Sequence, residues 1–116
     1  MNRGECMPFM QPYSIAREDV DDYLLKCGIR PGLLGFVYLG DLISQFCLEP
    51  ARMYCGLYAM YRLIGAKYGK GATGIEHACS NAIAASTNVR FSGMLASDFI
   101  AYIVITLPKH YEIKPL

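Results

Sequence analysis

Charge is scarce in this sequence, and the charges that are present nearly cancel. Only 18% of the 116 residues are charged, and the formal net charge is +1. These values argue against a protein that attracts nucleic acid or membrane surfaces through its net charge. The distribution is uneven, however, because residues 1–49 carry seven acidic and four basic side chains, whereas residues 50–90 carry five basic side chains against Glu76 alone. We therefore expect any anionic partner to meet the second half of the chain.

Other absences argue against several classes of protein. No apolar run approaches the ~20 residues of a membrane-spanning helix, and the N-terminus lacks the apolar region of a signal peptide. The five cysteines include no CxxC pair for a zinc site with His77 or His110, so reduced thiols in a cytoplasmic protein are the simplest interpretation. No Ser/His/Asp or Cys/His set and no GxxxxGK(S/T) phosphate loop can be assembled. We expect neither an enzyme nor a site for a metal or cofactor.

Apolar residues are abundant enough for one folded domain. They make up 53% of the chain, which suffices for the core of a single domain of this length. We place this domain at residues 14–116 and interpret residues 1–13, which contain two prolines, as an N-terminal arm. Because apolar residues recur mainly at helical spacing, an all-α domain of five or six helices is predicted.

The first two helices follow from a capping residue and from apolar spacing. Ser14 is expected to cap a helix that ends near Lys26, with acidic residues in its first turns. The next helix has apolar residues at i, i+3, i+7 and i+10, and the Glu49-Pro50 pair ends it. Its apolar residues are Phe36, Leu39, Ile43 and Phe46.

Apolar spacing also predicts the helices that follow. A third stripe recurs at i, i+4, i+7 and i+11, with a kink or break expected near Tyr61 that leaves one long helix or two short ones. Its residues are Met53, Leu57, Met60 and Ile64. A connector or helical turn is predicted at residues 92–95, and a last helix is expected from Ser97 to Leu107. Its β-branched segment would also suit a strand, but nothing else in the chain offers a strand partner.

Residues 61–85 have the spacing of a helix-turn-helix. Gly65 and Gly69 are four residues apart, as where a helix packs closely on a neighbour and then turns. Thr73 and Glu76 have the spacing of a capping box at the start of the second helix. The inner side of that helix is expected to be apolar and to consist of Ile75, Ala78, Cys79, Ala82 and Ile83.

Three segments, taken together, resemble a known family. They are CGIRPGLLGFVYLGDLI at residues 27–43, IGAKYGKGATGIEHACSNAI at residues 64–83 and ASDFIAYIVITL at residues 96–107. In order and spacing they are similar to the C-terminal effector domain of the stage-zero master response regulator of sporulation in endospore-forming Firmicutes. The resemblance implies an all-α helix-turn-helix domain that binds a short promoter box, often as tandem dimers. The receiver domain of that family has no counterpart in these 116 residues, so phosphorylation control of the ordinary kind is not expected.

The resemblance assigns the reading of DNA bases to residues 73–84. In the family this helix carries arginines together with a Glu and a His, and here Glu76 matches. The arginine and histidine positions of the family fall on Gly74, His77, Ser80 and Asn81. Because Arg reads guanine with two hydrogen bonds and also attracts phosphates, we expect weaker DNA binding than is usual in the family, and a need for a homodimer.

The candidate site combines this helix with basic residues beside it. We expect residues 73–84 to enter a major groove of double-stranded DNA, where Asn81 pairs with adenine and Ser80 and Thr73 bond phosphates. Three basic residues are expected to flank the DNA backbone. The full set of candidate DNA contacts is Lys67, Lys70, Thr73, Gly74, Glu76, His77, Ser80, Asn81 and Arg90.

A second interpretation is a helix-turn-helix fold that binds protein and not DNA. Tyr54, Tyr58 and Tyr61 recur at i, i+4 and i+7 beside the third apolar stripe, so this helix is either central in the core or faces another protein. The partner would be a second copy, another transcription regulator or RNA polymerase. A continuous positive surface around Lys67, Lys70 and Arg90 would favour DNA, whereas an exposed apolar patch would favour protein.

Overall fold

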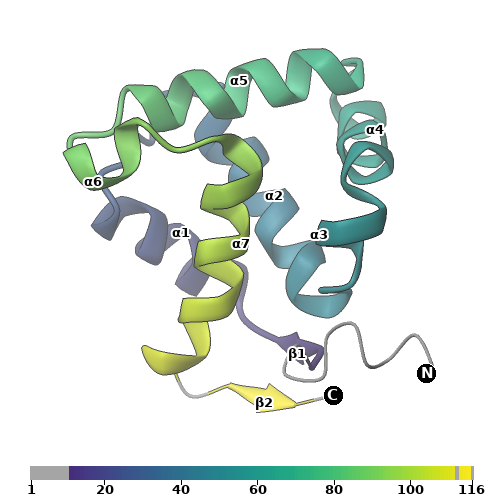
Figure 1. Ribbon diagram of the computed structural model, residues 1–116, viewed down its shortest axis with the longest axis vertical. Helices are drawn as coiled ribbons and strands as arrows, with labels where there is room; N and C mark the ends of the chain where they lie inside the picture. Colours follow the sequence, from purple (N-terminus) through teal and green to yellow (C-terminus); the bar gives the residue numbers. More distant parts are fainter. Residues whose placement is uncertain (1–10, 112, 116) are drawn as a thin grey trace.

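Five long helices and two single-turn helices make up the fold of the computed structural model, which describes residues 11–111 and 113–115 (Figure 1). The helices are α1 (Arg17–Lys26), α2 (Leu34–Leu48), α3 (Arg52–Cys55), α4 (Leu57–Tyr68), α5 (Ala72–Ala84), α6 (Val89–Ser92) and α7 (Ala96–Thr106), and the 3-10 turn η2 (Leu107–Lys109) follows. The predicted all-α class is confirmed. The described residues hold seven helices where five or six were predicted, because α3 and α6 are helices of four residues each. Within this part of the chain, no helix is long and apolar enough to cross a membrane.

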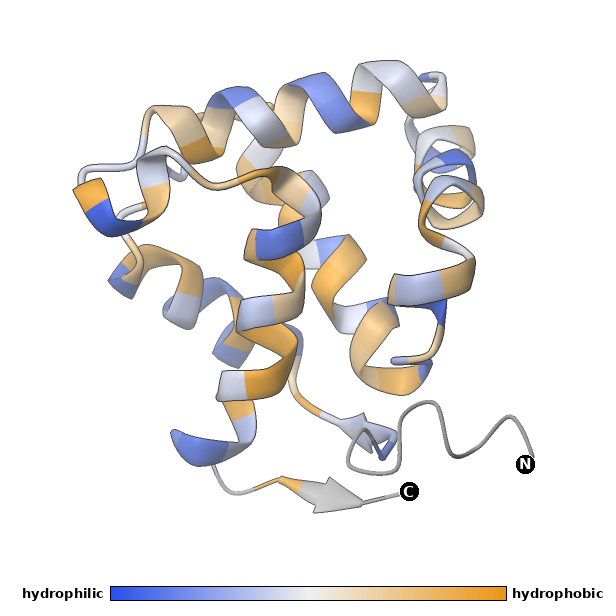
Figure 2. Ribbon diagram, viewed as in Figure 1, coloured by the Kyte–Doolittle hydropathy of each residue, from blue (hydrophilic) through white to orange (hydrophobic). Residues whose placement is uncertain are grey.

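Helix α2 forms the centre of the domain and contacts α1, α4, α5 and α7. The apolar stripe predicted for this helix is confirmed, because its four side chains are at most 8% exposed; they are Phe36, Leu39, Ile43 and Phe46. Ten of the 15 residues of α2 are buried. Figure 2 shows apolar residues concentrated on α2 and α7 in the middle of the molecule. The positions of the surrounding helices therefore depend on how each of them packs on α2.

The two ends of the described chain pair with each other. The strands β1 (Tyr13–Ser14) and β2 (Lys114–Pro115) form a two-stranded antiparallel ladder, a pairing that the sequence did not indicate. Tyr13 is buried, and its hydroxyl donates a hydrogen bond to the carbonyl of Val104. Of the predicted arm, Tyr13 thus belongs to the core, and residues 1–10 lie outside the described residues.

The prediction that Ser14 caps the first helix is wrong. Ser14 pairs with the C-terminal strand, and α1 begins three residues later, at Arg17, with Ala16 as its N-cap. No side chain caps this start. The acidic first turn that was predicted is present, because Glu18 and Asp19 lie there, where the helix dipole favours negative charge.

The third predicted helix is interrupted at Gly56 and not near Tyr61. Gly56 has an extended φ of −159°, so α3 ends there and α4 starts at the next residue. Of the predicted stripe, Met60 and Ile64 are buried, whereas Met53 and Leu57 are half-buried. The stripe therefore faces the core mainly through α4.

The last segment is helical, as predicted, although its sequence is rich in β-branched residues. Phe99, Ile100, Ile103 and Val104 are at most 1% exposed in α7. Their spacing of three and four residues places them on one side of a helix, toward α2. Burial of this stripe outweighs the local preference for a strand.

Candidate functional site

The helices α4 and α5 are joined by a tight turn at residues 69–71. Gly69 has the left-handed conformation, with φ 68° and ψ 32°, and ends α4. The Lys70 N–H donates a hydrogen bond to the Gly65 carbonyl, at 2.8 Å. A side chain at Gly65 would collide with the Lys70 carbonyl. The turn predicted at Gly69 is thus confirmed, whereas the close contact at Gly65 is with the backbone of that turn and not with a neighbouring helix.

Helix α5 packs on α2 through one face and leaves the opposite face open. The buried side consists of Ala72, Ile75, Cys79, Ala82 and Ile83, with Ala78 half-buried. The two helices approach closely at Gly35 of α2, where an added Cβ would collide with the Ala78 carbonyl and lie 2.5 Å from Ala82 Cβ. Figure 1 shows α5 along one edge of the molecule, with no element on its outer side.

The outer face of α5 carries polar but mostly uncharged side chains. Five of the predicted DNA contacts are exposed there, namely Thr73, Gly74, Glu76, His77 and Asn81, and Ser80 is half-buried. Thr73, His77 and Asn81 are four residues apart and therefore form one line along the helix. Glu76 is the single charged residue of α5. The face thus offers hydrogen-bond donors and acceptors without attracting anions by charge.

The start of α5 differs from the predicted capping box. Its N-cap is Gly71, so Thr73 is the second residue of the helix and cannot serve as its cap. This happens because the turn after Gly69 is so short that Ala72 already lies inside the helix, where it is buried. No side chain caps this end. The first N–H groups of α5, at residues 71–74, therefore lack an intrahelical partner and are available to an anion.

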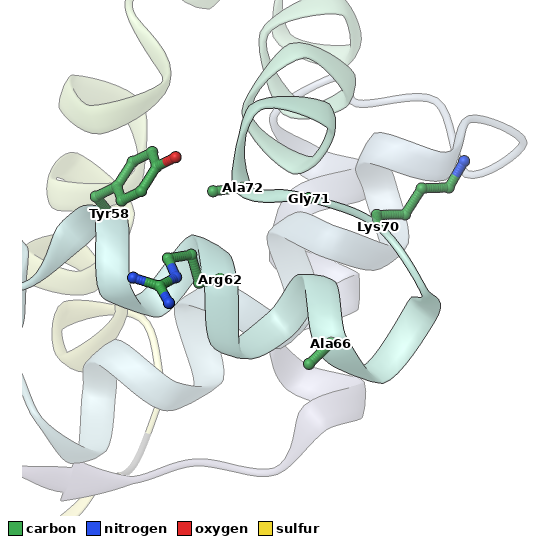
Figure 3. Close-up of a pocket in the computed structure, with 6 residues that line it drawn as sticks. All are labelled: Tyr58, Arg62, Ala66, Lys70, Gly71 and Ala72. Atoms are coloured by element: carbon green, nitrogen blue, oxygen red, sulfur yellow. The ribbon is translucent and has the colours of Figure 1, made fainter.

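A cleft of about 340 Å³ lies beside this helix start. Its lining residues are Tyr58, Arg62, Ala66, Lys70, Gly71 and Ala72. Figure 3 shows the Tyr58 and Arg62 side chains near each other on α4, whereas the Lys70 side chain extends away from them on the far side of the turn. Among the described residues, neither cation has a carboxylate within 4.0 Å; the ion pairs present involve other side chains. The start of α5 is therefore flanked by one cation on each side.

Lys67, one of the predicted phosphate contacts, lies against a buried carboxylate. Its ammonium is 3.1 Å from Oδ2 of Asp41, a residue of α2 that is only 6% exposed. Tyr68 donates to the same oxygen, and Arg17 pairs with the other one. Burial alone would raise the pKa of Asp41, but hydrogen bonds from Tyr68 and Lys67 and the charge of Arg17 outweigh it and lower the pKa. One ionised carboxylate thus ties the end of α4 to α1 and α2.

Arg90 lies beyond the other end of α5, in α6. Its guanidinium lies over the rings of Phe91 and Tyr102, at 5.4 and 5.0 Å from the ring centroids. The 13 residues of α5 correspond to a length of ~20 Å. Lys70 and Arg90 therefore stand at opposite ends of the helix, and the structure does not bring Lys67, Lys70 and Arg90 together in one patch.

Sequence reasoning overlooked Arg62 and Asp41. Arg62 follows Tyr58 by four residues within α4, and this spacing is the signal that would have placed both side chains beside the cleft. For Asp41 the signal is a carboxylate within the apolar stripe of α2. Such a residue must find partners when it is buried, because an unpaired buried charge is strongly unfavourable.

The cysteines offer no reactive or metal-binding cluster in the described part of the chain. Cys27, Cys47, Cys55 and Cys79 form no disulfide there, and Cys6 lies outside the described residues. Burial raises the pKa of Cys27 and Cys47 to about 11 and that of Cys79 to about 12. No three His, Cys, Asp or Glu side chains among residues 11–111 and 113–115 are close enough to hold a metal ion.

No protein-family model matches this sequence, and no curated protein matches it. The three segments that resemble the sporulation effector domain correspond to the loop after α1 with the first part of α2, to the end of α4 with α5, and to α7. Membership of that family stays a prediction from these motifs.

Proposed function

We propose that this chain binds double-stranded DNA through the outer face of α5 and acts as a transcription regulator of the sporulation effector-domain type. The observation that carries the proposal is the start of α5, where uncapped N–H groups lie between Arg62 and Lys70. Both kinds of group attract phosphate oxygens. Because the two cations point in different directions from the helix start (Figure 3), they suit successive phosphates of a nucleic-acid strand better than one small anion.

Phosphates held at its start would bring the outer face of α5 to the base edges of a major groove. The Asn81 amide can pair with adenine through two hydrogen bonds, and the Glu76 carboxylate can accept one from cytosine. His77 lies next to Glu76 in sequence and one turn before Asn81, and its imidazole can donate to or accept from a base edge. With no Lys or Arg on this face, sequence discrimination depends on these three side chains.

The affinity of one copy is expected to be low. Only Arg62 and Lys70 flank the helix start, and each phosphate that a protein neutralises contributes separately to the salt-dependent part of DNA binding. Binding to adjacent half-sites by two copies would compensate for this, because linked sites bind more tightly than either site alone.

A salt titration of binding to random-sequence duplex DNA tests the proposal. Fluorescence anisotropy of labelled DNA should show binding at low salt that weakens steeply as salt rises. Lys70→Ala should reduce the slope of log affinity against log salt by about one, because one phosphate contact is removed. Lys109→Ala is the matched control, since Lys109 is also an exposed lysine but belongs to η2. Its slope should equal that of the wild type.

Absence of binding at low salt would refute the proposal for DNA as a whole. Binding with a slope that Lys70→Ala leaves unchanged would refute the assigned surface only. A follow-up on selected sequences with Asn81→Ala would then show whether α5 reads bases, since a good amide–adenine pair is worth ~1–3 kcal/mol of discrimination.

A second function, protein binding, is favoured by a different surface. The exposed side of α4 carries Tyr58, Leu63 and two alanines, with Arg62 and Lys67 as its charged residues. An exposed apolar face of this kind is typical of an interaction surface.

A further inference from the structure

A groove lies beside the outer face of α5, where this helix meets the start of α2. We call it the α2–α5 groove, and its volume is about 210 Å³. Its lining residues are Leu33, Leu34, Gly35, Ala78, Asn81 and Ala82. Asn81 is the single polar side chain among them, and none of the six residues is charged. The groove is therefore suited to an apolar group that lies next to a hydrogen-bonding one.

Asn81 connects the α2–α5 groove with the face that we propose for DNA. On that face, Asn81 continues the exposed line of Thr73 and His77. Positions 78 and 82 form the neighbouring row of the same helix, one residue further along at each step. Ala78 is half-buried and Ala82 is buried, so this row lies deeper than the exposed line. A molecule bound along the exposed line therefore also covers the groove.

Leu34 contributes the part of the α2–α5 groove that is most exposed to solvent. It is the first residue of α2, and its side chain is 59% exposed. The next residue, Gly35, holds the start of α2 against α5, because an added Cβ there would collide with the Ala78 carbonyl. Leu34 thus presents exposed apolar surface at a fixed position beside α5. Removing this surface from water would be favourable.

We propose that the α2–α5 groove binds the C5-methyl group of a thymine in the major groove, next to the adenine that pairs with Asn81. This inference rests on the proposed binding of DNA by α5. Every base pair presents hydrogen-bonding groups in the major groove, but only thymine presents an apolar group there. The aliphatic side chains of the α2–α5 groove offer a phosphate no counter-charge, and they offer a polar base edge no partner for its hydrogen bonds. The thymine methyl is therefore the group of DNA that matches this groove.

The size of the α2–α5 groove favours part of a nucleic acid over a free small molecule. Pockets for small-molecule ligands have volumes of ~300–1,000 Å³ and contain several polar groups that orient the ligand. This groove has about 210 Å³ and one polar side chain. The amide of that side chain, Asn81, matches the N6 and N7 atoms of adenine. Because adenine and the thymine methyl occur in the same kind of base pair, the amide and the groove would both select A·T-rich DNA.

Two duplex polymers that differ only in the thymine methyl test this inference. Alternating poly(dA–dT) carries the methyl group on every base pair, and alternating poly(dA–dU) carries none. Competition measured by fluorescence anisotropy at low salt should show that the wild type binds poly(dA–dT) about fourfold more tightly, which is the factor expected for burial of one methyl-sized group. Leu34→Ala should reduce this preference to less than about twofold, because most of the apolar contact is removed. Leu25→Ala is the matched control, since Leu25 is an exposed leucine of α1, and it should keep the full preference. Circular dichroism confirms that both variants keep their helices.

The results distinguish failure of the methyl contact from failure of DNA binding. Lys70→Ala should weaken binding to both polymers by the same factor, because a phosphate contact carries no information on sequence. Equal binding of the wild type to the two polymers would overturn the methyl contact and leave the proposed binding of DNA intact. A preference for poly(dA–dT) that survives Leu34→Ala would overturn the assignment to the α2–α5 groove. Absence of binding to both polymers would refute the proposed function, and the methyl contact with it.

Discussion

The helices α4 and α5 are neighbours in sequence and both rest on α2, but they are held there in different ways. Helix α5 is held by shape, because Gly35 of α2 leaves room for the backbone of α5 at Ala78 and Ala82. The end of α4 is held by charge, because Lys67 and Tyr68 bind the buried carboxylate of Asp41. Close steric packing does not depend on pH or salt, whereas ion pairs depend on both.

This difference has a consequence for the proposed DNA-binding surface. The position of α5 depends on its packing against α2 at Gly35, which acid and salt leave unchanged. The turn that leads into α5, and with it Lys70, depends on how the end of α4 is placed. Acid should therefore disturb the flank of the site before it disturbs the face of α5.

The largest effect on stability is expected when Gly35→Ala disrupts the close packing of α5 on α2. The added Cβ would collide with the Ala78 carbonyl, which is backbone and can move only if α5 moves. We expect the free energy of unfolding to fall by about 3 kcal/mol, although Ala otherwise favours a helix over Gly by ~1 kcal/mol. Chemical denaturation followed by circular dichroism measures the loss.

The matched control for this substitution is Gly32→Ala. An added Cβ at Gly32 meets no atom within 4 Å, and the residue is exposed. Its effect on stability should stay within ~0.5 kcal/mol. Equal stability of Gly35→Ala and Gly32→Ala would show that α5 adapts to α2 and is not fixed by shape.

A smaller effect on stability is expected when Asp41→Asn removes the carboxylate that pairs with Arg17 and Lys67. At neutral pH the amide accepts hydrogen bonds less strongly and carries no charge for Arg17 and Lys67, so we expect a loss of about 1–2 kcal/mol. The pKa of Asp41 is lower in the folded protein than the ~3.9 of an unfolded chain, so protons bind the unfolded state more tightly. The contribution of Asp41 is therefore full above pH ~4 and is lost as pH falls through its folded-state pKa.

Unfolding curves at several pH values check this prediction. The difference between wild type and Asp41→Asn should be present at neutral pH and should disappear in acid. Asp98→Asn serves as the control, because Asp98 is exposed in the first turn of α7 and forms no ion pair within the described chain. A difference that persists unchanged in acid would show that Asp41 contributes through packing and not through its charge.

The packing of α5 on α2 and the ion pairs of Asp41 could not be predicted equally well from the sequence. Apolar periodicity predicted the helices and most of the buried side of α5, because burial in a helical core requires side chains at intervals of three and four residues. The role of Gly35 could not be predicted, because the sequence around it does not show which distant segment packs against it. The role of Asp41 could not be predicted either, because its partners, Arg17 and Lys67, are 24 and 26 residues away in the sequence.

Turn geometry explains the errors at the candidate site. Thr73 and Glu76 have the spacing of a capping box, but the left-handed Gly69 shortens the turn and starts α5 before Thr73. From a single sequence, the start of a helix can be predicted only to within a few residues, because several capping residues compete there. The same limit misplaced the start of α1 at Ser14.

The smallest effect on stability is expected for Lys67→Ala, and it tells the two roles of the basic residues apart. Lys67 is 62% exposed, so its ion pair with Asp41 is screened by water, and Tyr68 and Arg17 continue to hold the carboxylate. The denaturation midpoint should fall by less than it does for Asp41→Asn. If Lys67 binds Asp41 and not phosphate, the salt slope of DNA binding should stay at the wild-type value, whereas Lys70→Ala should lower it. A slope lowered equally by both substitutions would mean that DNA draws Lys67 away from Asp41, and the end of α4 would then be held by charge only in the absence of DNA.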